Sequence, residues 1–311
     1  MTSPDLKISI VIPVYNAEKT IYALVTQLIS EISSCYKLEI ILVNDYSADD
    51  SHGECINLYN DHKDIIKYFS LAKNFGEHNA VMAGLNKTSG NYIIIMDDDF
   101  QNPVTEVLKL IDFSVKNDYD VVYTFYADKK HKAWRNIGSR LNNYMANILL
   151  KKPKNLYLSS FKCLNRFIVS EIIKYDLPYP YIDGLILRST SNIGTIQVVH
   201  EKREKGKSGY TLRKLIKLWS NMFTSFSVIP LRISIFVGLF FAITGFLFGI
   251  YSVIEHFVVP GLPAGFSLTI TAIFVFAGIQ LISLGMIGEY IGRIFISQNK
   301  QPQFTIKKEY L

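Results

Sequence analysis

Residues 233–292 contain no lysine or arginine, and Glu255 and Glu289 are their only acidic residues. A water-exposed surface of this length would carry more charge, because 19% of the residues in the whole chain are charged. Two apolar runs, residues 233–254 and 267–291, lie inside this stretch. Each is long enough to cross about 30 Å of hydrocarbon as a helix. A buried helical hairpin of a soluble protein is the alternative, but runs of this length favour two membrane spans.

The positive charges that flank these runs predict the orientation of the chain. Arg232 precedes the first run, and the segment that connects the two runs has no lysine or arginine. The basic residues that follow the second run are Arg293, Lys300, Lys307 and Lys308. Because segments rich in lysine and arginine stay in the cytoplasm, we expect both termini and the whole N-terminal part to be cytoplasmic.

Other absences narrow the class of protein. The N-terminus lacks the basic and apolar regions of a signal peptide. The three cysteines, Cys35, Cys55 and Cys163, match no metal-binding spacing, so plain thiols in a reducing compartment are expected. The net charge of +6 is compatible with nucleic acid, but two membrane spans favour anionic lipid and phosphorylated substrates. We therefore expect no nucleic-acid partner.

The first part of the chain alternates strand-like and helix-like patterns, which is typical of an α/β fold with a mostly parallel sheet. The strand-like runs are residues 7–15, 39–44, 65–71, 92–96 and 120–125, and amphipathic stretches such as residues 17–33 and 77–87 separate them. No Gly-x-Gly-x-x-Gly pattern follows the first run, so the dinucleotide-binding fingerprint is missing.

Polar residues gather where these predicted strands end. They are Tyr15 and Asn16, Asn44 and Asp45, Lys73 and Asn74, and finally Asp97, Asp98 and Asp99. In an open α/β sheet, ligands bind outside the carboxyl ends of the strands. Loops are polar in any protein, but four of them with this chemistry at one edge indicate a binding site.

The three consecutive aspartates are the most informative of these groups. They follow a buried-strand pattern, where carboxylates a few ångströms apart repel each other and raise each other's pKa. A hard divalent cation such as Mg²⁺ or Mn²⁺ removes that conflict. The alternative is a solvated acidic turn that caps the next helix, with Pro103 near its start.

The sequence between residues 127 and 210 is less regular and rich in basic groups. A helix is expected over residues 134–150, and a second amphipathic helix over residues 210–229, beside the first membrane run. A basic amphipathic helix in that position favours the membrane interface over ordinary packing on the globular part. The polar tail from residue 298 to residue 311 has no catalytic pattern.

Several motifs together resemble one family, the polyprenyl-phosphate glycosyltransferases. These are inverting GT-A enzymes related to dolichol-phosphate mannose synthase, and bacterial undecaprenyl-phosphate sugar transferases with two C-terminal spans are the most similar. The motifs are residues 10–16 (IVIPVYN), 43–47 (VNDYS), 73–76 (KNFG), 96–103 (MDDDFQNP), Trp134-Arg135 with Ser139 and Asn142, and residues 200–203 (HEKR) with 206–208 (GKS).

The resemblance implies a fold, an activity and a location. The expected parts are a GT-A catalytic domain over residues 1–209, an interfacial helix over 210–230, a two-span hairpin over 231–293 and a cytoplasmic tail over 294–311. The expected activity is transfer of a sugar from a nucleotide-sugar to undecaprenyl phosphate, with UDP as the expected carrier and GDP or dTDP as the alternatives. The location is the bacterial inner membrane, and the resemblance implies a homo-oligomer, a tetramer.

Roles for individual residues also follow from the resemblance. Nucleotide binding is assigned to Pro13, Tyr15, Glu18, Asp45, Lys73, Asp97 and Asp98. Asp97, Asp99 and Gln101 would bind the Mg²⁺ or Mn²⁺ ion, and Asp97, Asp99 and Arg203 are the expected catalytic residues. Acceptor phosphate binding is assigned to Arg135, Ser139, Ser160, Arg203, Lys207 and Ser208.

Two positions depart from the family pattern. Ser159-Ser160-Phe161-Lys162 stands where the family often has an aspartate, which weakens any claim for a catalytic base there. Tyr46 replaces the usual glycine of the Asp-Asp-Gly-Ser turn, which questions the geometry of that loop.

Other functions fit the sequence less well. A phosphatase with an aspartyl nucleophile would not have Gln101 after its aspartates, and a processive polysaccharide synthase would need a Gln-x-x-Arg-Trp motif and more spans. A catalytically weak nucleotide-sugar-binding subunit that regulates a membrane partner is the remaining alternative. Release of nucleotide on addition of polyprenyl phosphate distinguishes an enzyme from such a subunit.

Overall fold

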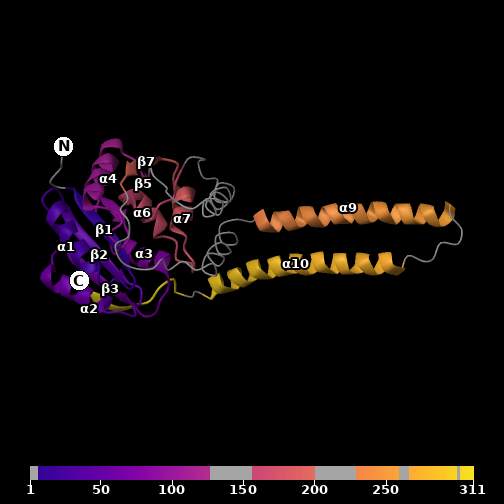
Figure 1. Ribbon diagram of the computed structural model, residues 1–311, viewed down its shortest axis with the longest axis horizontal. Helices are drawn as coiled ribbons and strands as arrows, with labels where there is room; N and C mark the ends of the chain where they lie inside the picture. The colour runs from indigo at the N-terminus through magenta and orange to yellow at the C-terminus, as the bar shows by residue number, and fades with distance from the viewer. Residues whose placement is uncertain (1–5, 127–155, 200–228, 259–265, 300–301) are drawn as a thin grey trace. The chain divides into compact units, whose positions relative to one another are not determined.

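The computed structural model describes residues 6–126, 156–199, 229–258, 266–299 and 302–311 (Figure 1). The chain divides into two compact units. The first comprises Met1–Tyr210 together with Gln301–Leu311, and the second comprises Thr211–Lys300. The predicted helix over residues 134–150 lies outside the described residues, and so does the one over 210–229 apart from its last residue, Ile229.

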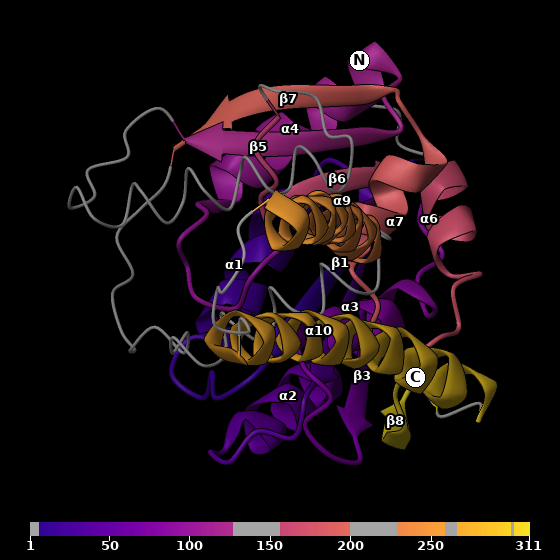
Figure 2. The same cartoon turned by 90° about the vertical axis from the view of Figure 1, so that its right-hand side faces the viewer.

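An eight-stranded sheet forms the centre of the first unit, in the order β7-β5-β6-β4-β1-β2-β3-β8 (Figure 2). Strands β6 and β8 run antiparallel to their neighbours, and the others share one direction. The strands are β1 (Lys7–Val14), β2 (Lys37–Asn44), β3 (Ile66–Leu71), β4 (Tyr92–Ile95), β5 (Val121–Tyr126), β6 (Lys162–Asn165), β7 (Ile193–Val198) and β8 (Ile306–Tyr310).

The predicted α/β architecture is confirmed, and the five predicted strands are β1 to β5 with small differences at their ends. The helices of this unit are α1 (Ile21–Ile32), α2 (Ser51–Asp61), α3 (Glu77–Leu85), α4 (Val104–Asn117), α6 (Arg166–Ile172) and α7 (Ile182–Ser189). Strand β8 is new, since the sequence predicted only a polar tail there. It pairs with β3 and is the edge strand on that side of the sheet.

Side chains alternate between the two faces of the central strands, as a pleated sheet requires. Ile10 and Ile40 are fully buried and belong to the same core cluster as residues of α1, α2 and α4. Val11, on the opposite face, meets α3 at Gly84. A Cβ at Gly84 would lie 2.4 Å from Val11 Cγ1, so only glycine allows this close approach of helix and strand.

A buried carboxylate joins the first strands near their amino ends. Glu39 is 3% exposed, and its carboxylate accepts hydrogen bonds from Ser9 Oγ at 2.6 Å and from the Ser89 backbone N–H at 2.8 Å. Lys7 and Lys67 form ion pairs with it at 3.2 and 2.8 Å. Burial by itself raises the pKa of Glu39, but the hydrogen bonds from Lys67, Ser9 and Ser89 outweigh burial and lower it to about 2.

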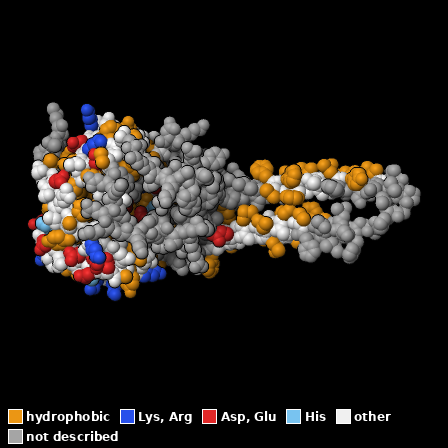
Figure 3. Space-filling model, viewed as in Figure 1, with side chains coloured by type: hydrophobic (Ala, Val, Ile, Leu, Met, Phe, Trp, Pro, Cys, Tyr) orange, Lys and Arg blue, Asp and Glu red, His pale blue; other side chains and the backbone are white. Residues whose placement is uncertain are grey.

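The second unit contains two long helices, α9 (Ile229–Val258) and α10 (Phe266–Gln298). Their surfaces carry mainly hydrophobic side chains, with Phe236 and Leu281 both 69% exposed (Figure 3). The window Val275–Gly292 of α10 has a mean hydropathy of 1.4 and is long enough to cross a membrane. The corresponding apolar window of α9, Ile235–Leu247, is shorter, so the first of the two predicted spans stays a prediction.

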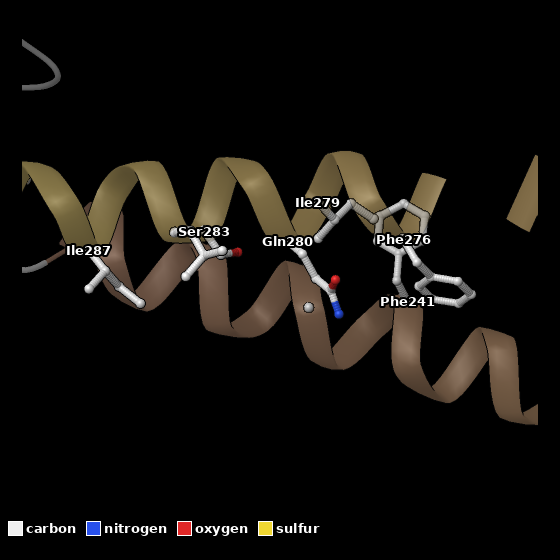
Figure 4. A pocket seen from close by; sticks show the side chains of 8 residues that line it. Phe241, Phe276, Ile279, Gln280, Ser283 and Ile287 are labelled. Atoms are coloured by element: carbon white, nitrogen blue, oxygen red, sulfur yellow. The ribbon is translucent and has the colours of Figure 1, made fainter. Parts of the chain in front are cut away.

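A cleft of about 500 Å³ lies between α9 and α10. Gln280 and Ser283 of α10 point into it among apolar side chains that include Phe241 and Ile287 (Figure 4). Gly245 of α9 lies close to Phe276 of α10, where an added Cβ would come within 2.8 Å of the ring. Small residues thus allow the two helices to approach each other closely, as is common in membrane hairpins.

We expect Glu39→Gln to lower the free energy of unfolding of the first unit by about 2–3 kcal/mol near pH 7, because hydrogen bonds to charged groups are lost. Since the pKa of Glu39 falls from its ordinary value of 4.5 to about 2 on folding, its stabilisation is complete above pH 4.5 and lost towards pH 2. Urea unfolding of the full chain in detergent, followed by circular dichroism across this range, measures the difference.

The matched control is Glu309→Gln, which removes the exposed ion pair with Lys87 and should change stability by less than about 0.5 kcal/mol. A difference between wild type and Glu39→Gln that stays constant from pH 5 to pH 2 would contradict the role given to the carboxylate.

Candidate functional site

The carboxyl ends of four neighbouring parallel strands meet at one edge of the sheet. Val14 of β1 pairs with Asn44 of β2, and Asn44 in turn pairs with Ser70 of β3. On the other side of β1, Val11 pairs with Ile95 of β4. The residues that follow these strands are therefore brought together, as the sequence predicted.

The end of β1 is joined to the three aspartates. The Tyr15 backbone N–H donates to Asp98 Oδ2 at 3.0 Å, while the Tyr15 ring is 49% exposed. Pro13 is half-buried at the end of the same strand. Asp98 thus orders the backbone beside an accessible aromatic ring, which is a suitable surface for a nucleotide base.

The loops after β1 and β2 are linked by reciprocal hydrogen bonds. The Asn16 N–H donates to Ser47 Oγ at 3.0 Å, and the Ala48 N–H donates to Asn16 Oδ1 at 2.9 Å. Glu18 Oε2 accepts from the Asp50 N–H at 3.1 Å. Tyr46, at the position where the family has glycine, has a φ of 59°. The turn therefore keeps the left-handed backbone that glycine favours, in spite of the larger side chain.

Asp45 holds the loop that carries Lys73. Its carboxylate is 3% exposed and accepts from the Phe75 N–H at 2.7 Å and the Gly76 N–H at 2.8 Å. Burial raises the pKa of Asp45, and these two hydrogen bonds oppose that rise. Lys73 Nζ lies 5.0 Å from the centre of the Phe75 ring. Since a carboxylate has about four acceptor positions, the two backbone contacts leave capacity for a ligand.

The three aspartates after β4 have separate partners. Asp97 Oδ2 accepts from Ser160 Oγ at 2.6 Å, and Asp99 Oδ1 accepts from the Gln101 N–H at 3.2 Å. Phe100, between Asp99 and Gln101, has a φ of 59°. Asp97, Asp98 and Asp99 are all partly exposed.

The surroundings of Asp97 carry an excess of negative charge. Burial raises the pKa of Asp97 to about 6, and Glu77 and Asp99 add to the rise, whereas Ser160 and Lys162 oppose it. A divalent cation beside these carboxylates would relieve the repulsion.

A buried ion pair behind this edge was missed by the sequence analysis. Lys162 and Asp183 are 4% and 8% exposed, and the lysine Nζ donates to Asp183 Oδ1. The Tyr123 hydroxyl donates to the same oxygen at 2.9 Å, and Lys162 Nζ lies 5.0 Å from the Tyr123 ring centre. A lysine inside the apolar run Phe161–Leu164 was the available signal, because a buried charge needs a partner.

Of the residues predicted to bind the acceptor phosphate, the structure describes Ser160. Arg135, Ser139, Arg203, Lys207 and Ser208 lie outside the described residues. Ser160 is described, and its hydroxyl contacts the carboxylate of Asp97. Its predicted contact with an acceptor therefore stays a prediction, next to an observed contact with a predicted metal ligand.

The residues at this edge fit a divalent cation. Among the described residues, no three His, Cys, Asp or Glu side chains form a ready-made metal cluster. Mg²⁺ is typically bound by one or two carboxylates together with substrate phosphates and water, not by a complete protein cage. Asp97 and Asp99 meet that requirement.

Comparison with known proteins identifies the family. Residues 9–173 match the model "Glycosyl transferase family 2", and residues 229–294 match "GtrB C-terminal hairpin". The chain belongs to glycosyl transferase family 2. This glycosyltransferase is 34% identical over 313 aligned residues to an undecaprenyl-phosphate 4-deoxy-4-formamido-L-arabinose transferase of Yersinia pestis, covering 99% of this chain and 95% of the relative. A relative of the same name in Yersinia pseudotuberculosis matches equally well.

Solved structures support the fold of the first unit, Met1–Tyr210 with Gln301–Leu311, which we call the catalytic unit. Glucosyl-3-phosphoglycerate synthase from Mycobacterium tuberculosis in complex with UDP superposes with a TM-score of 0.51 at 17% identity, covering 70% of this chain and 79% of the other. Its complex with Mn²⁺, UDP and phosphoglyceric acid also has a TM-score of 0.51, at 18% identity and with 68% and 74% coverage. At this identity the likeness shows the fold alone, and it confirms the expected GT-A-like arrangement.

We expect Ser160→Ala to raise the Mn²⁺ concentration required for half-maximal turnover by about tenfold, because groups that orient metal ligands typically contribute 10–100-fold to metal affinity. Titration of turnover with Mn²⁺ measures the change. Ser170→Ala is the control, because the Ser170 hydroxyl donates to the Phe167 carbonyl within α6, away from the predicted site. An unchanged Mn²⁺ requirement with a weaker KM for the acceptor would favour the acceptor role instead.

Proposed function

We propose that this glycosyltransferase moves a sugar from a nucleotide-sugar, with UDP as carrier, to the phosphate of undecaprenyl phosphate, with inversion at the anomeric carbon. One observation carries the proposal. The chain that contains this carboxylate-rich edge is similar to transferases named for undecaprenyl phosphate over 99% of its length. The similarity includes residues 229–294, which match a hairpin model. The product would be a lipid-linked monosaccharide for cell-surface glycans.

The donor would bind at the edge formed by β1 to β4. The Tyr15 ring is accessible there, and Asp45 fixes the loop that carries Lys73 and Gly76. Glu18 and Asp98 hold the neighbouring backbone through the Asp50 and Tyr15 amides. A structural neighbour of the same fold has been solved with UDP and Mn²⁺, which supports UDP as the carrier and a divalent ion as cofactor.

Asp97, Asp99 and Gln101 would hold Mg²⁺ or Mn²⁺ next to the diphosphate. The bound cation would neutralise the charge that builds up on the departing nucleotide. The protein keeps the two carboxylates oriented. The Ser160 hydroxyl does this for Asp97, and the backbone N–H of Gln101 does it for Asp99. Fixed groups of this kind lower the barrier because they need no rearrangement during the reaction.

The acceptor chemistry explains why no strong general base is required. A phosphate monoester is already ionised near neutral pH, since its second pKa is about 6. The site must therefore align this anion with the anomeric carbon and keep water out. By family resemblance we assign the acceptor phosphate to Arg135, Ser139, Ser160, Arg203, Lys207 and Ser208, of which Ser160 also donates its hydroxyl to Asp97.

We further propose that α9 and α10 both cross the inner membrane and that the catalytic unit faces the cytoplasm. Exposed large hydrophobic side chains on both helices support this arrangement, and so does the match of residues 229–294 to a hairpin model. The absence of lysine and arginine between the two apolar runs supports an external connecting segment. A homo-oligomer is expected by family resemblance.

Asp99→Asn should reduce the release of UDP on addition of undecaprenyl phosphate by about 100-fold or more, because the cation that stabilises the leaving group loses a ligand. A panel of nucleotide-sugars, assayed on the full chain in detergent, measures the release and identifies the sugar. EDTA should abolish release, and Mn²⁺ or Mg²⁺ should restore it.

Asp118→Asn is the matched control, since Asp118 ends α4 with a left-handed φ of 51°, which asparagine tolerates well. It should keep wild-type release within about twofold, as expected for a neutral surface change. Wild-type activity in Asp99→Asn, or full activity in EDTA, would defeat the metal assignment.

Cysteine labelling tests the membrane topology. In a background that replaces Cys35, a cysteine introduced as Gly261→Cys should react with a membrane-impermeant maleimide in intact spheroplasts, because it would lie outside. Ser3→Cys should react only after the membrane is permeabilised. Labelling of Ser3→Cys in intact spheroplasts would show the catalytic unit on the wrong side for a cytoplasmic donor.

A further inference from the structure

The C-terminal strand β8 completes the edge of the catalytic sheet. Tyr310 pairs with Tyr68 of β3, and Lys308 pairs with Ser70, before an irregularity shifts the register. The Ala72 N–H donates to the Thr305 carbonyl at 2.9 Å. The chain segment that follows the second long helix in sequence thus becomes part of the catalytic unit.

Tyr310 covers a buried tyrosine of β3. Its ring stacks on Tyr68 with the ring centres 5.4 Å apart and an interplanar angle of 23°. Tyr59 of α2 packs against the same ring at 5.6 Å and donates its hydroxyl to the Leu311 carbonyl at 2.8 Å. Tyr68 is fully buried, so the position of its ring depends on these neighbours.

The hydroxyl of Tyr68 reaches the end of β2. It accepts from Asn44 Nδ2 at 3.2 Å, and His52 Nδ1 lies within hydrogen-bond distance of it. The Oδ1 atom of Asn44 accepts hydrogen bonds from the Ser47 N–H at 2.9 Å and from Ser47 Oγ at 2.7 Å. Asn44 is 2% exposed, so both ends of its side chain are held inside the protein.

Ser47 connects Asn44 to the proposed donor site through hydrogen bonds. Its hydroxyl oxygen accepts from the Asn16 N–H, next to Tyr15. Asn16 and Tyr46 have φ values of 56° and 59°, a backbone region that costs free energy for residues other than glycine. Such a conformation persists only where the surrounding contacts enforce it.

We propose that Tyr310 is a positioning residue for nucleotide binding. By stacking on Tyr68 it fixes Asn44, which in turn holds the turns that carry Tyr15 and Asp45. The segment after the hairpin would therefore adjust donor affinity without touching the donor. This inference rests on the proposed function, because it takes the carboxyl ends of β1 and β2 to be the nucleotide site.

Two measurements on the full chain in detergent test the proposal. Hydrogen–deuterium exchange follows the amides of Asn16 and Ser47 without any ligand, and calorimetric titration follows the binding of UDP with Mn²⁺. Tyr310→Leu keeps an apolar side chain but removes the stacked ring. Tyr310→Phe keeps the ring, and Glu309→Gln removes only the neighbouring ion pair with Lys87.

Tyr310→Leu should speed exchange at both amides and weaken UDP binding about fivefold, which corresponds to about 1 kcal/mol. Tyr310→Phe and Glu309→Gln should stay within about twofold of wild type in both measurements. Amides of α4 should exchange at the wild-type rate in every variant, which would show that the fold is intact.

Unchanged exchange at Asn16 and Ser47 in Tyr310→Leu would overturn the proposed coupling, whatever UDP does. Faster exchange with undiminished UDP binding would overturn the link to the donor. Equal losses in Tyr310→Leu and Glu309→Gln would show that attachment of the strand matters and not the ring, which also contradicts the proposal. Failure of the wild-type chain to bind UDP would instead reject the donor site itself.

Discussion

The structure depends on one electrostatic constraint, the crowding of carboxylates at the end of β4. Three consecutive aspartates beside Glu77 would repel one another strongly if nothing compensated their charge. The protein gives each a separate partner: Ser160 for Asp97, the Tyr15 amide for Asp98 and the Gln101 amide for Asp99. These partners orient the carboxylates but leave the excess negative charge in place, which suits a site completed by a cation.

The rest of the edge consists of loops that hold one another. Asp45 connects the end of β2 to the loop after β3, and Ser47 connects it to the loop after β1. Ligand sites need such support, because a loop that moves by an ångström loses most of its contribution to binding and alignment. The buried ion pair of Lys162 and Asp183 holds β6 and α7 together behind the same edge.

The sequence predicted the elements whose signal is local. Strands β1, β2, β4 and β5 contain apolar runs with several β-branched residues. The polar residues that follow β1 to β4 come to one edge because parallel strands end together. Strand β8 was missed because Ile306–Tyr310 contains two lysines and a glutamate. Charged residues are common on edge strands, and only pairing with distant β3 makes this segment a strand.

Contacts between distant residues also limited the prediction of the site. Ser160 lies 63 positions from Asp97 in sequence, and no local pattern indicates that its hydroxyl contacts that carboxylate. Tyr46 put the geometry of a turn that usually contains glycine in question, and the structure shows it with a φ of 59°. The role of Ser160 and the backbone conformation of Tyr46 therefore depend on contacts with distant residues, which residue type alone does not reveal.

The most direct test of this account is a structure of the full chain in detergent with Mn²⁺ and UDP, in which anomalous scattering locates the metal. We expect one Mn²⁺ bound by Asp97 and Asp99 and by the diphosphate, with the base beside Tyr15 at the ends of β1 and β2. A nucleotide bound elsewhere, or bound at this edge with no metal between it and the aspartates, would contradict it.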